Sequence, residues 1–170
     1  MIIDIFLDSL KDKNIEVIEK NTLAKFTYKN QKFSVRVSKV CFAYRKNKDE
    51  YRVQVNEENR EKLRSMHTSG YWSVIFGYHE KTNTFTAWDN KLLFSSKAKN
   101  RSMYTRESLL FRVNDEKFES YMYEDQFLQK NTISISMKPK NIFYYLDIIK
   151  NSNIHREQVF RQINNSMIRN

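Results

Sequence analysis

The chain has 170 residues, of which 40% are hydrophobic and 14% aromatic, enough for one globular domain with its own core and too few for two full domains. Its formal net charge is +10, and its one cysteine, Cys41, excludes a framework of internal disulfide bonds. Because the apolar stretch near the start contains Asp4, we expect no signal peptide, no membrane-spanning helix and no membrane partner, and a location in the reducing cytoplasm.

The amino-terminal part predicts a helix followed by strands. Apolar residues recur at helical spacing over residues 2–12, which indicates a short amphipathic helix. Three strand patterns follow, over residues 14–20, 22–28 and 32–40. The third is the clearest, because Phe33, Val35 and Val37 fall on one face of a strand and polar side chains on the other.

A strand that runs into a helix is predicted in the middle of the chain. Apolar and polar residues alternate over residues 50–56 and the pattern stops at Asn56, a favourable N-cap. Glu57 and Glu58 follow, and carboxylates stabilise the first turn of a helix. We therefore expect a short helix directly after this strand.

The next segments indicate a hairpin and a late strand. Residues 71–80 and 84–89 are rich in aromatic and β-branched side chains and flank a short polar turn. Residues 131–137 alternate as a strand, and Pro139 stands where the first turn of a helix tolerates it. The fold class is therefore mainly β with short helices at the start, in the middle and at the C-terminus. A sheet of many short strands must pair or cover the free backbone groups of its edge strands, which favours a closed or half-closed barrel.

The end of the chain predicts a separate element. We assign residues 1–150 to the domain, and residues 151–170 to a C-terminal helix or a connector to a further domain. An amphipathic helix would present Val159, Phe160, Ile163 and Met167 on one side.

The positive charge is concentrated in two segments. Residues 36–52 hold six basic and two acidic side chains, and residues 90–106 hold five basic and none acidic. These two segments thus carry nine of the ten net positive charges. A uniform solubility coat would not be distributed in this way, whereas Lys and Arg placed against phosphates release counterions and gain affinity. The distribution predicts a polyanion-binding surface.

Several kinds of catalytic site are excluded or disfavoured. The two glycines, Gly70 and Gly77, cannot form a glycine-rich phosphate loop, and the three histidines lack metal-ligand spacing. A small metal-dependent nuclease stays open as an alternative, because Asp89 and Lys91 have the outline of a carboxylate and lysine pair that holds a metal and activates water. Asp89 is, however, also of a residue type that commonly caps a turn. We expect no enzymatic activity and no cofactor.

The side-chain types in the basic segments suit base reading as well as phosphate binding. Arginine makes bidentate hydrogen bonds to guanine, asparagine does so to adenine, and serine serves phosphates or bases. The candidates of these types are Arg45, Asn47, Arg52, Ser95, Ser96, Asn100, Arg101, Ser102 and Arg106.

Four segments resemble DNA-recognition domains of prokaryotic restriction endonucleases. They are EYRVQVN (50–56), WSVIFGYHEKTNTFTAWD (72–89), FSSKAKNRSMYTRESL (94–109) and ISISMKPKNIFYYL (133–146). In this order they are similar to the plant B3-type DNA-binding pseudobarrel, and most like the N-terminal specificity domains of McrB-like (LlaJI-type) restriction GTPases. The resemblance implies a seven-stranded open β-barrel that grips the DNA major groove with two arms.

The two arms that the resemblance implies coincide with the two basic segments. We name residues 39–52 the first arm and residues 91–104 the second arm. The expected DNA contacts are Lys39, Tyr44, Arg45, Lys46, Asn47, Lys48, Arg52, Lys91, Ser95, Ser96, Lys97, Lys99, Asn100, Arg101, Ser102 and Tyr104. The expected partner is double-stranded DNA, and a nuclease subunit or domain of the same restriction system would supply NTP hydrolysis and cleavage.

One further alternative is a reader of modified bases such as methylcytosine. Such a protein flips a nucleotide into an aromatic pocket, for which Tyr71, Trp72, Tyr78 and Trp88 offer ring surfaces. Aromatic residues on strands are, however, far more often part of the core.

Overall fold

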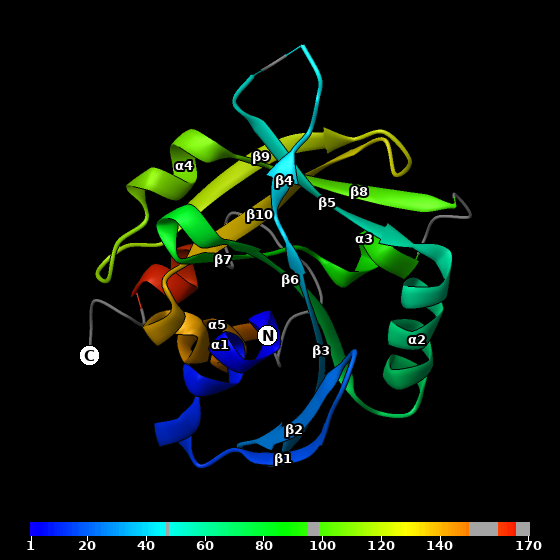
Figure 1. The fold of residues 1–170 in the computed structure, drawn as a ribbon, viewed down its shortest axis with the longest axis vertical. Coiled ribbons are helices and arrows are strands. Elements are labelled where there is room, and N and C mark those ends of the chain that lie inside the picture. The colour runs from blue at the N-terminus through cyan, green and yellow to red at the C-terminus, as the bar shows by residue number, and fades with distance from the viewer. Residues whose placement is uncertain (47, 95–98, 150–159, 166–170) are drawn as a thin grey trace.

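The computed structural model of the protein describes residues 1–46, 48–94, 99–149 and 160–165 (Figure 1). The large sheet contains, in spatial order, β1 (Glu16–Lys20), β2 (Ala24–Tyr28), β3 (Gln31–Lys39), β6 (Trp72–His79), β7 (Thr84–Ala87), β10 (Lys130–Met137) and β9 (Glu119–Asp125). A second sheet contains β4 (Cys41–Phe42), β5 (Glu50–Asn56) and β8 (Asn100–Arg106). The α-helices are α1 (Ile2–Asp8), α2 (Glu57–Thr68), α3 (Asn90–Phe94), α4 (Glu107–Arg112) and α5 (Ile142–Ile149). The expectation of a mainly β fold with short helices is confirmed.

The large sheet is mixed and does not close into a barrel, so the closed form of the expected barrel is not found. β3 and β6 run parallel while the other neighbours are antiparallel, and β1 and β9 form the two edges. The physical reason is that the sheet has a hydrophobic core on each face, so both faces are covered without curling around a single core. At the β1 edge, a bulge between Val17 and Glu19 interrupts regular pairing, a common way to protect an exposed strand.

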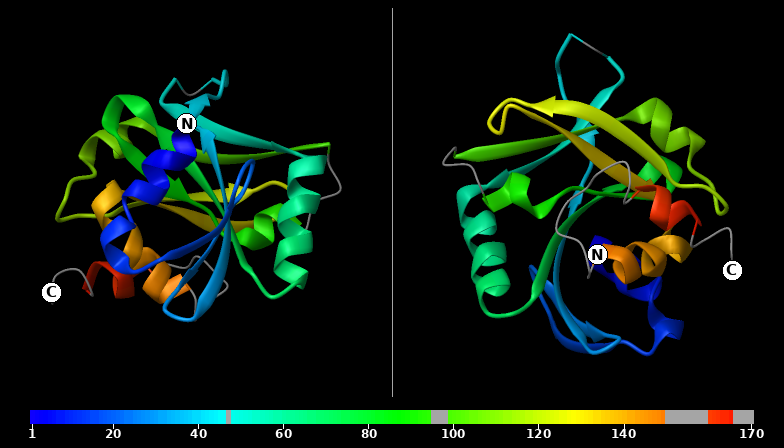
Figure 2. Two further views of the ribbon diagram at one scale, coloured as in Figure 1. Left: turned by 60° about the horizontal axis from the view of Figure 1, so that its bottom comes forward. Right: turned by 180° about the vertical axis from the view of Figure 1, so that it is seen from behind.

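The first core packs α1 and α5 against one face of the large sheet (Figure 2). Phe6 of α1 lies 4.9 Å from Phe76 of β6 between ring centroids, and the ring of Tyr145 of α5 lies 5.5 Å from Phe76. The second core lies on the other face, where α2, α3 and the second sheet pack over Ile75 and Trp88. The second sheet is thus fixed to the large sheet through an apolar layer.

Most elements that the sequence predicts are present. The strand from residue 50 ends at Asn56, whose side chain accepts a hydrogen bond from the Asn59 amide at 2.9 Å and caps α2. β6 and β7 form the expected hairpin, and Pro139 opens the turn that leads into α5. β8, β9, α3 and α4 were not predicted as separate elements. β8 was missed because its sequence is rich in charged and polar residues, which is typical of a loop. In the structure its residues are alternately buried and at least partly exposed, as in a strand.

The described part of the C-terminal segment packs on the first core. Residues 160–165 are helical, and Ile163 is fully buried there. The Asn164 side chain accepts a hydrogen bond from the Phe118 amide at 3.4 Å. The expected apolar positions Val159 and Met167 lie outside the described residues.

Within the described ranges, no helix combines the length and the apolar character needed to cross a membrane.

Gly77 of β6 allows the second sheet to approach the large sheet closely. A Cβ atom at this position would lie 2.6 Å from Val40 Cγ2 and 2.9 Å from both Val53 Cγ2 and Trp88 Cη2. Real Cβ atoms do not approach carbon this closely, so a side chain here would push β5 away from β6.

We expect Gly77→Ala to lower the free energy of unfolding by about 1 to 3 kcal/mol, because overpacking forces neighbouring side chains and backbone to shift. Denaturant unfolding measures this. Gly70→Asn is the control, since no atom lies within 4 Å of the added Cβ and Asn tolerates the positive φ of 91° better than other side chains. Unchanged stability of the Gly77→Ala variant would contradict the close approach of the two sheets.

Candidate nucleic-acid interface

The ends of the two arms meet in the second sheet. The first arm ends within β5 and the second arm ends within β8, and these two strands pair antiparallel. Neighbours across the pair are Arg52 and Tyr104, Gln54 and Ser102, and Asn56 and Asn100. The Arg52 guanidinium lies 3.5 Å from the Ser102 hydroxyl, 50 residues away along the chain. Two basic segments that are distant in sequence therefore share one surface.

The second sheet has one apolar and one polar face, because side chains alternate along each strand. Val53, Val55 and Met103 point into the second core and are at most 1% exposed. The opposite face, named here the outer face, carries Arg52, Gln54, Asn56, Asn100, Ser102, Tyr104 and Arg106, all partly or fully exposed. These side chains hold the hydrogen-bonding groups that can read base edges or phosphates.

The loop that joins β4 to β5 adds exposed basic groups next to this face. Arg45, Lys46 and Lys48 are exposed, and the Tyr44 side chain is 84% exposed. The Tyr44 φ of 56° lies in the left-handed region, which is unusual for a bulky residue and often marks a functional position. The loop projects beyond the rest of the fold at the top of Figure 1.

The two acidic residues of the first arm anchor this loop. The Asp49 carboxylate accepts hydrogen bonds from the amide and the hydroxyl of Ser108, at 2.8 and 2.5 Å, at the start of α4. Glu50 lies 3.2 Å from the Arg45 guanidinium. The acidic side chains thus fix the base of the loop, and its lysines stay exposed to solvent.

A chain of arginine and tyrosine contacts links the loop to β8 and β9. The Arg45 guanidinium lies 4.9 Å from the centre of the Tyr104 ring, which in turn lies 5.7 Å from the Tyr123 ring. Tyr121 stacks on Tyr123, and Arg106 lies over Tyr121 at 5.1 Å. A hydrogen bond with Tyr121 raises the pKa of Arg106, so this cation is firmly charged. The sequence prediction missed Tyr121 and Tyr123, although the alternation of residues 119–125 is a strand signal.

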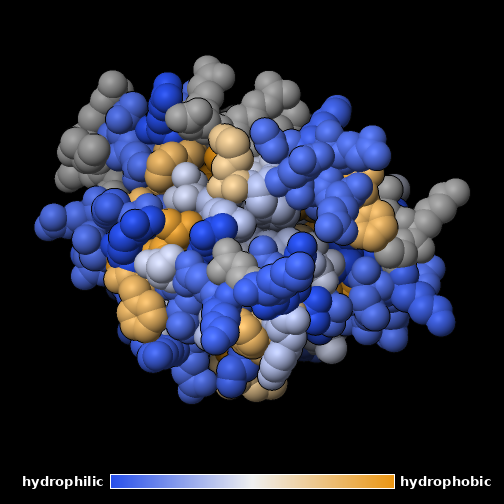
Figure 3. Space-filling model, turned by 90° about the horizontal axis from the view of Figure 1, so that it is seen from above, coloured by the Kyte–Doolittle hydropathy of each residue, from blue (hydrophilic) through white to orange (hydrophobic). Residues whose placement is uncertain are grey.

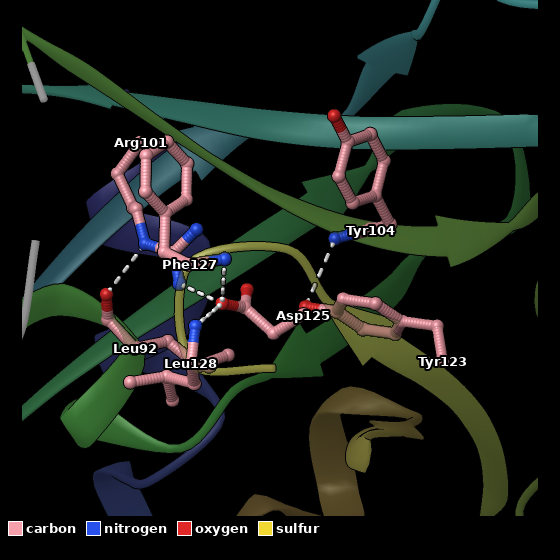
Figure 4. A network of polar contacts seen from close by, with 7 residues as sticks. All are labelled: Leu92, Arg101, Tyr104, Tyr123, Asp125, Phe127 and Leu128. Carbon is pink, nitrogen blue, oxygen red and sulfur yellow. Dashed lines mark hydrogen bonds and ion pairs between the residues drawn. The ribbon is translucent and has the colours of Figure 1, made fainter. Parts of the chain in front are cut away.

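Arg101 was predicted to read a base, and the structure corrects this. The side chain is 2% exposed and forms an ion pair with Asp125 at 2.5 Å (Figure 4). Its Nε donates a hydrogen bond to the Leu92 carbonyl at 2.8 Å, and its guanidinium lies over the Phe127 ring. On β8 it occupies an inward position between two outward ones, and the buried carboxylate compensates its desolvation. Arg101 therefore holds the second arm in place and does not face the solvent.

Three other predicted residues lie outside the strands of the second sheet. Lys39 ends β3 and lies 3.5 Å from the Glu80 carboxylate. Lys91 is exposed on α3. Lys99 is exposed directly before β8. The predicted contacts Asn47, Ser95, Ser96 and Lys97 lie outside the described residues.

Three of the residues behind the two alternative functions, Asp89, Tyr78 and Trp88, have structural roles. The Asp89 carboxylate accepts a hydrogen bond from the Lys91 amide at 2.9 Å and caps the start of α3. Among the residues described, no three His, Cys, Asp or Glu side chains form a group able to hold a metal ion. Trp88 and Tyr78 are buried in the two cores, and Trp88 donates a hydrogen bond to the Tyr104 carbonyl at 2.9 Å. Neither ring is available to a flipped base.

Comparison with protein families gives a match to the Methylase-associated X1 family, MTaX1, over residues 31–146. This range is more than half of the chain, so the chain belongs to that family, which is associated with restriction–modification systems. The predicted association with restriction systems agrees with this finding, whereas the B3-type and McrB-like relationships stay predictions. Comparisons with curated proteins and with solved structures give no match.

We expect Arg101→Ala to lower the free energy of unfolding by about 3 to 5 kcal/mol, because it leaves the buried Asp125 carboxylate without its cation. Thermal or denaturant unfolding measures the change. Lys99→Ala removes a neighbouring, exposed charge and should leave stability within about 0.5 kcal/mol of the wild type. Unchanged stability of the Arg101 variant would contradict its structural role.

Proposed function

We propose that this member of the Methylase-associated X1 family binds double-stranded DNA and serves as the target-recognition domain of a restriction–modification system. One observation carries the proposal: exposed arginine, lysine and asparagine side chains from two distant basic segments lie together on the outer face and the adjoining loop. Nine of the ten net positive charges belong to these segments. Such clustering is the electrostatic signature of a polyanion-binding surface.

The shape of the β4–β5 hairpin supports binding in the major groove. That groove is about 12 Å wide in B-DNA and admits a two-stranded β-ribbon. The hairpin projects from the fold, and Figure 3 shows that the end of the molecule on which it lies is covered mainly by hydrophilic side chains. This shape and the sequence resemblance support the mode of binding that we propose, with both arms in one groove as in B3-type domains.

The contacts divide by side-chain type. Lys46, Lys48 and Lys99 are flexible point charges suited to phosphates. Arg52 and Asn100 are held by the β5–β8 pair and present planar donors suited to guanine and adenine edges. Specificity then depends on a few residues that the sheet keeps in a fixed register, and affinity depends on the lysines.

We also propose that chemistry on the DNA is carried out elsewhere in the system. A methylase, or a nuclease subunit with NTP hydrolysis, would act once this domain has located the target. The family description supports a methylase as one such partner.

Replacing Lys46 or Lys48 by alanine should weaken binding to all duplexes alike and lower the slope of log affinity against log salt by about one unit, because one counterion less is released. Fluorescence anisotropy at several salt concentrations measures both effects. Lys11→Ala removes an exposed charge from the 3₁₀ turn Lys11–Lys13, which lies at the end of the molecule opposite the β4–β5 loop in Figure 1, and should change neither. An equal effect of all three changes would point to unspecific attraction.

Arg52→Ala should relax preference at one base pair by about 1 to 3 kcal/mol if the guanidinium reads guanine. A selection on random duplexes at a fixed salt concentration first identifies the target, and competition binding then measures the preference. Arg112→Ala is the control, since this arginine is 61% exposed at the end of α4 and outside the outer face. If the Arg52 change weakened target and random duplexes equally, base reading by this residue would be excluded.

A further inference from the structure

We infer that a cavity beside Tyr104 receives a single unpaired base from the bound DNA, namely a base with an amino group on its pairing edge. The inference rests on the proposed function and adds a second recognition element to it. The cavity lies where the loop of the first arm, the start of β8 and the β9–β10 turn meet.

The size of the cavity fits a small planar ligand. Its volume is about 290 Å³. Sites for drug-sized molecules range from about 300 to 1,000 Å³, so this cavity lies at the lower limit and suits a base better than a larger group. Residues of three segments line it, including Arg45, Ser102, Tyr104, Tyr123, Glu124 and Gln126.

The walls offer flat surfaces for stacking. The rings of Tyr104 and Tyr123 are nearly perpendicular, with an angle of 86° between their planes. The Tyr123 hydroxyl lies 3.4 Å from the Tyr104 amide, which fixes the corner between them (Figure 4). The Arg45 guanidinium already lies over the Tyr104 ring, and its side chain is 44% exposed, so it has room to move outward and cover a base from the other side.

The charge of the cavity favours a neutral base over a phosphate. Both arginines in its wall are ion-paired, Arg45 with Glu50 and Arg101 with Asp125. Glu124 takes part in none of the ion pairs found among the described residues, so the wall carries a net negative charge. An anion inside would be repelled, whereas a carboxylate accepts hydrogen bonds from the amino groups of cytosine, adenine or guanine.

The polar groups around the cavity are suited to reading a pairing edge. The side-chain amides of Asn100 and Gln126 and the hydroxyl of Ser102 provide both donors and acceptors. Thymine has no amino group for Glu124 and is therefore disfavoured. Proteins that hold an extruded base combine such edge contacts with stacking on aromatic side chains.

The test uses duplexes with one bulged nucleotide, because an unpaired base enters the cavity without the cost of breaking a pair. Bulged cytosine, adenine, guanine and thymine are compared with a bulged abasic site, which bends DNA similarly but has no base. In fluorescence anisotropy, the wild type should bind the duplexes with bulged cytosine, adenine or guanine about tenfold more tightly than the abasic duplex, with thymine giving less.

Variants separate stacking in the cavity from general DNA binding. Tyr104→Ala should abolish the preference for a base over the abasic site, and Tyr104→Phe should keep it, because the ring alone stacks. Gln54→Ala is the matched control on the outer face outside the cavity, and it should affect base and abasic duplexes equally. Circular dichroism during thermal unfolding verifies that each variant is folded.

The outcomes distinguish this inference from the proposed function. Salt-dependent duplex binding with no preference for a base, or a preference that survives Tyr104→Ala, overturns the cavity assignment and leaves DNA recognition intact. If no duplex binds, DNA recognition fails, and an NMR titration with free cytidine and thymidine decides about the cavity alone. Shifts of the Ser102, Tyr104 and Gln126 amides with cytidine but not thymidine support it, and their absence overturns it.

Discussion

The buried ion pair between Arg101 and Asp125 fixes the position of the proposed interface. Arg101 also donates a hydrogen bond to the Leu92 carbonyl of α3, and Asp125 accepts hydrogen bonds from the Phe127 and Leu128 amides. The ion pair thus joins three segments, namely α3, β8 and the β9–β10 turn. The side chains of Arg101 and Asp125 are each only 2% exposed. In a low-dielectric interior each charge is costly without the other, so the pair enforces one arrangement of these segments. The outer face and the neighbouring cavity both depend on it.

The charged residues of the two arms therefore serve two different purposes. Arg101, Asp49 and Glu50 are used within the protein, where they connect strands, loop and α4. Lys46 and Lys48 are exposed, so their charged groups are solvated and can change position on flexible side chains. A high density of positive charge predicts a polyanion surface, but it does not indicate which side chains face the partner, because that depends on the pleat of the strand.

The two cores give this interface a rigid support. β5 and β8 pack their inner side chains on the second core, and the close approach at Gly77 ties β5 to the central strand β6. A preformed platform pays little ordering entropy on binding, which favours a domain that must compare many DNA sequences. The projecting loop, with the exposed Tyr44, is the part suited to adapt to the groove.

Periodicity and capping signals in the chain were sufficient for β3, β5, the β6–β7 hairpin, β10 and the Asn56 cap, because side-chain alternation and N-cap chemistry act within a few residues. Charge distribution singled out two basic segments, whose ends pair in β5 and β8. The open sheet, the burial of Arg101 and the cavity between Arg45, Tyr104 and Tyr123 depend on contacts between residues far apart in the chain. Such contacts leave no local pattern in the sequence. Whether an arginine is buried or exposed depends on whether a carboxylate from a distant part of the chain packs against it, and the residues next to the arginine in sequence do not reveal this.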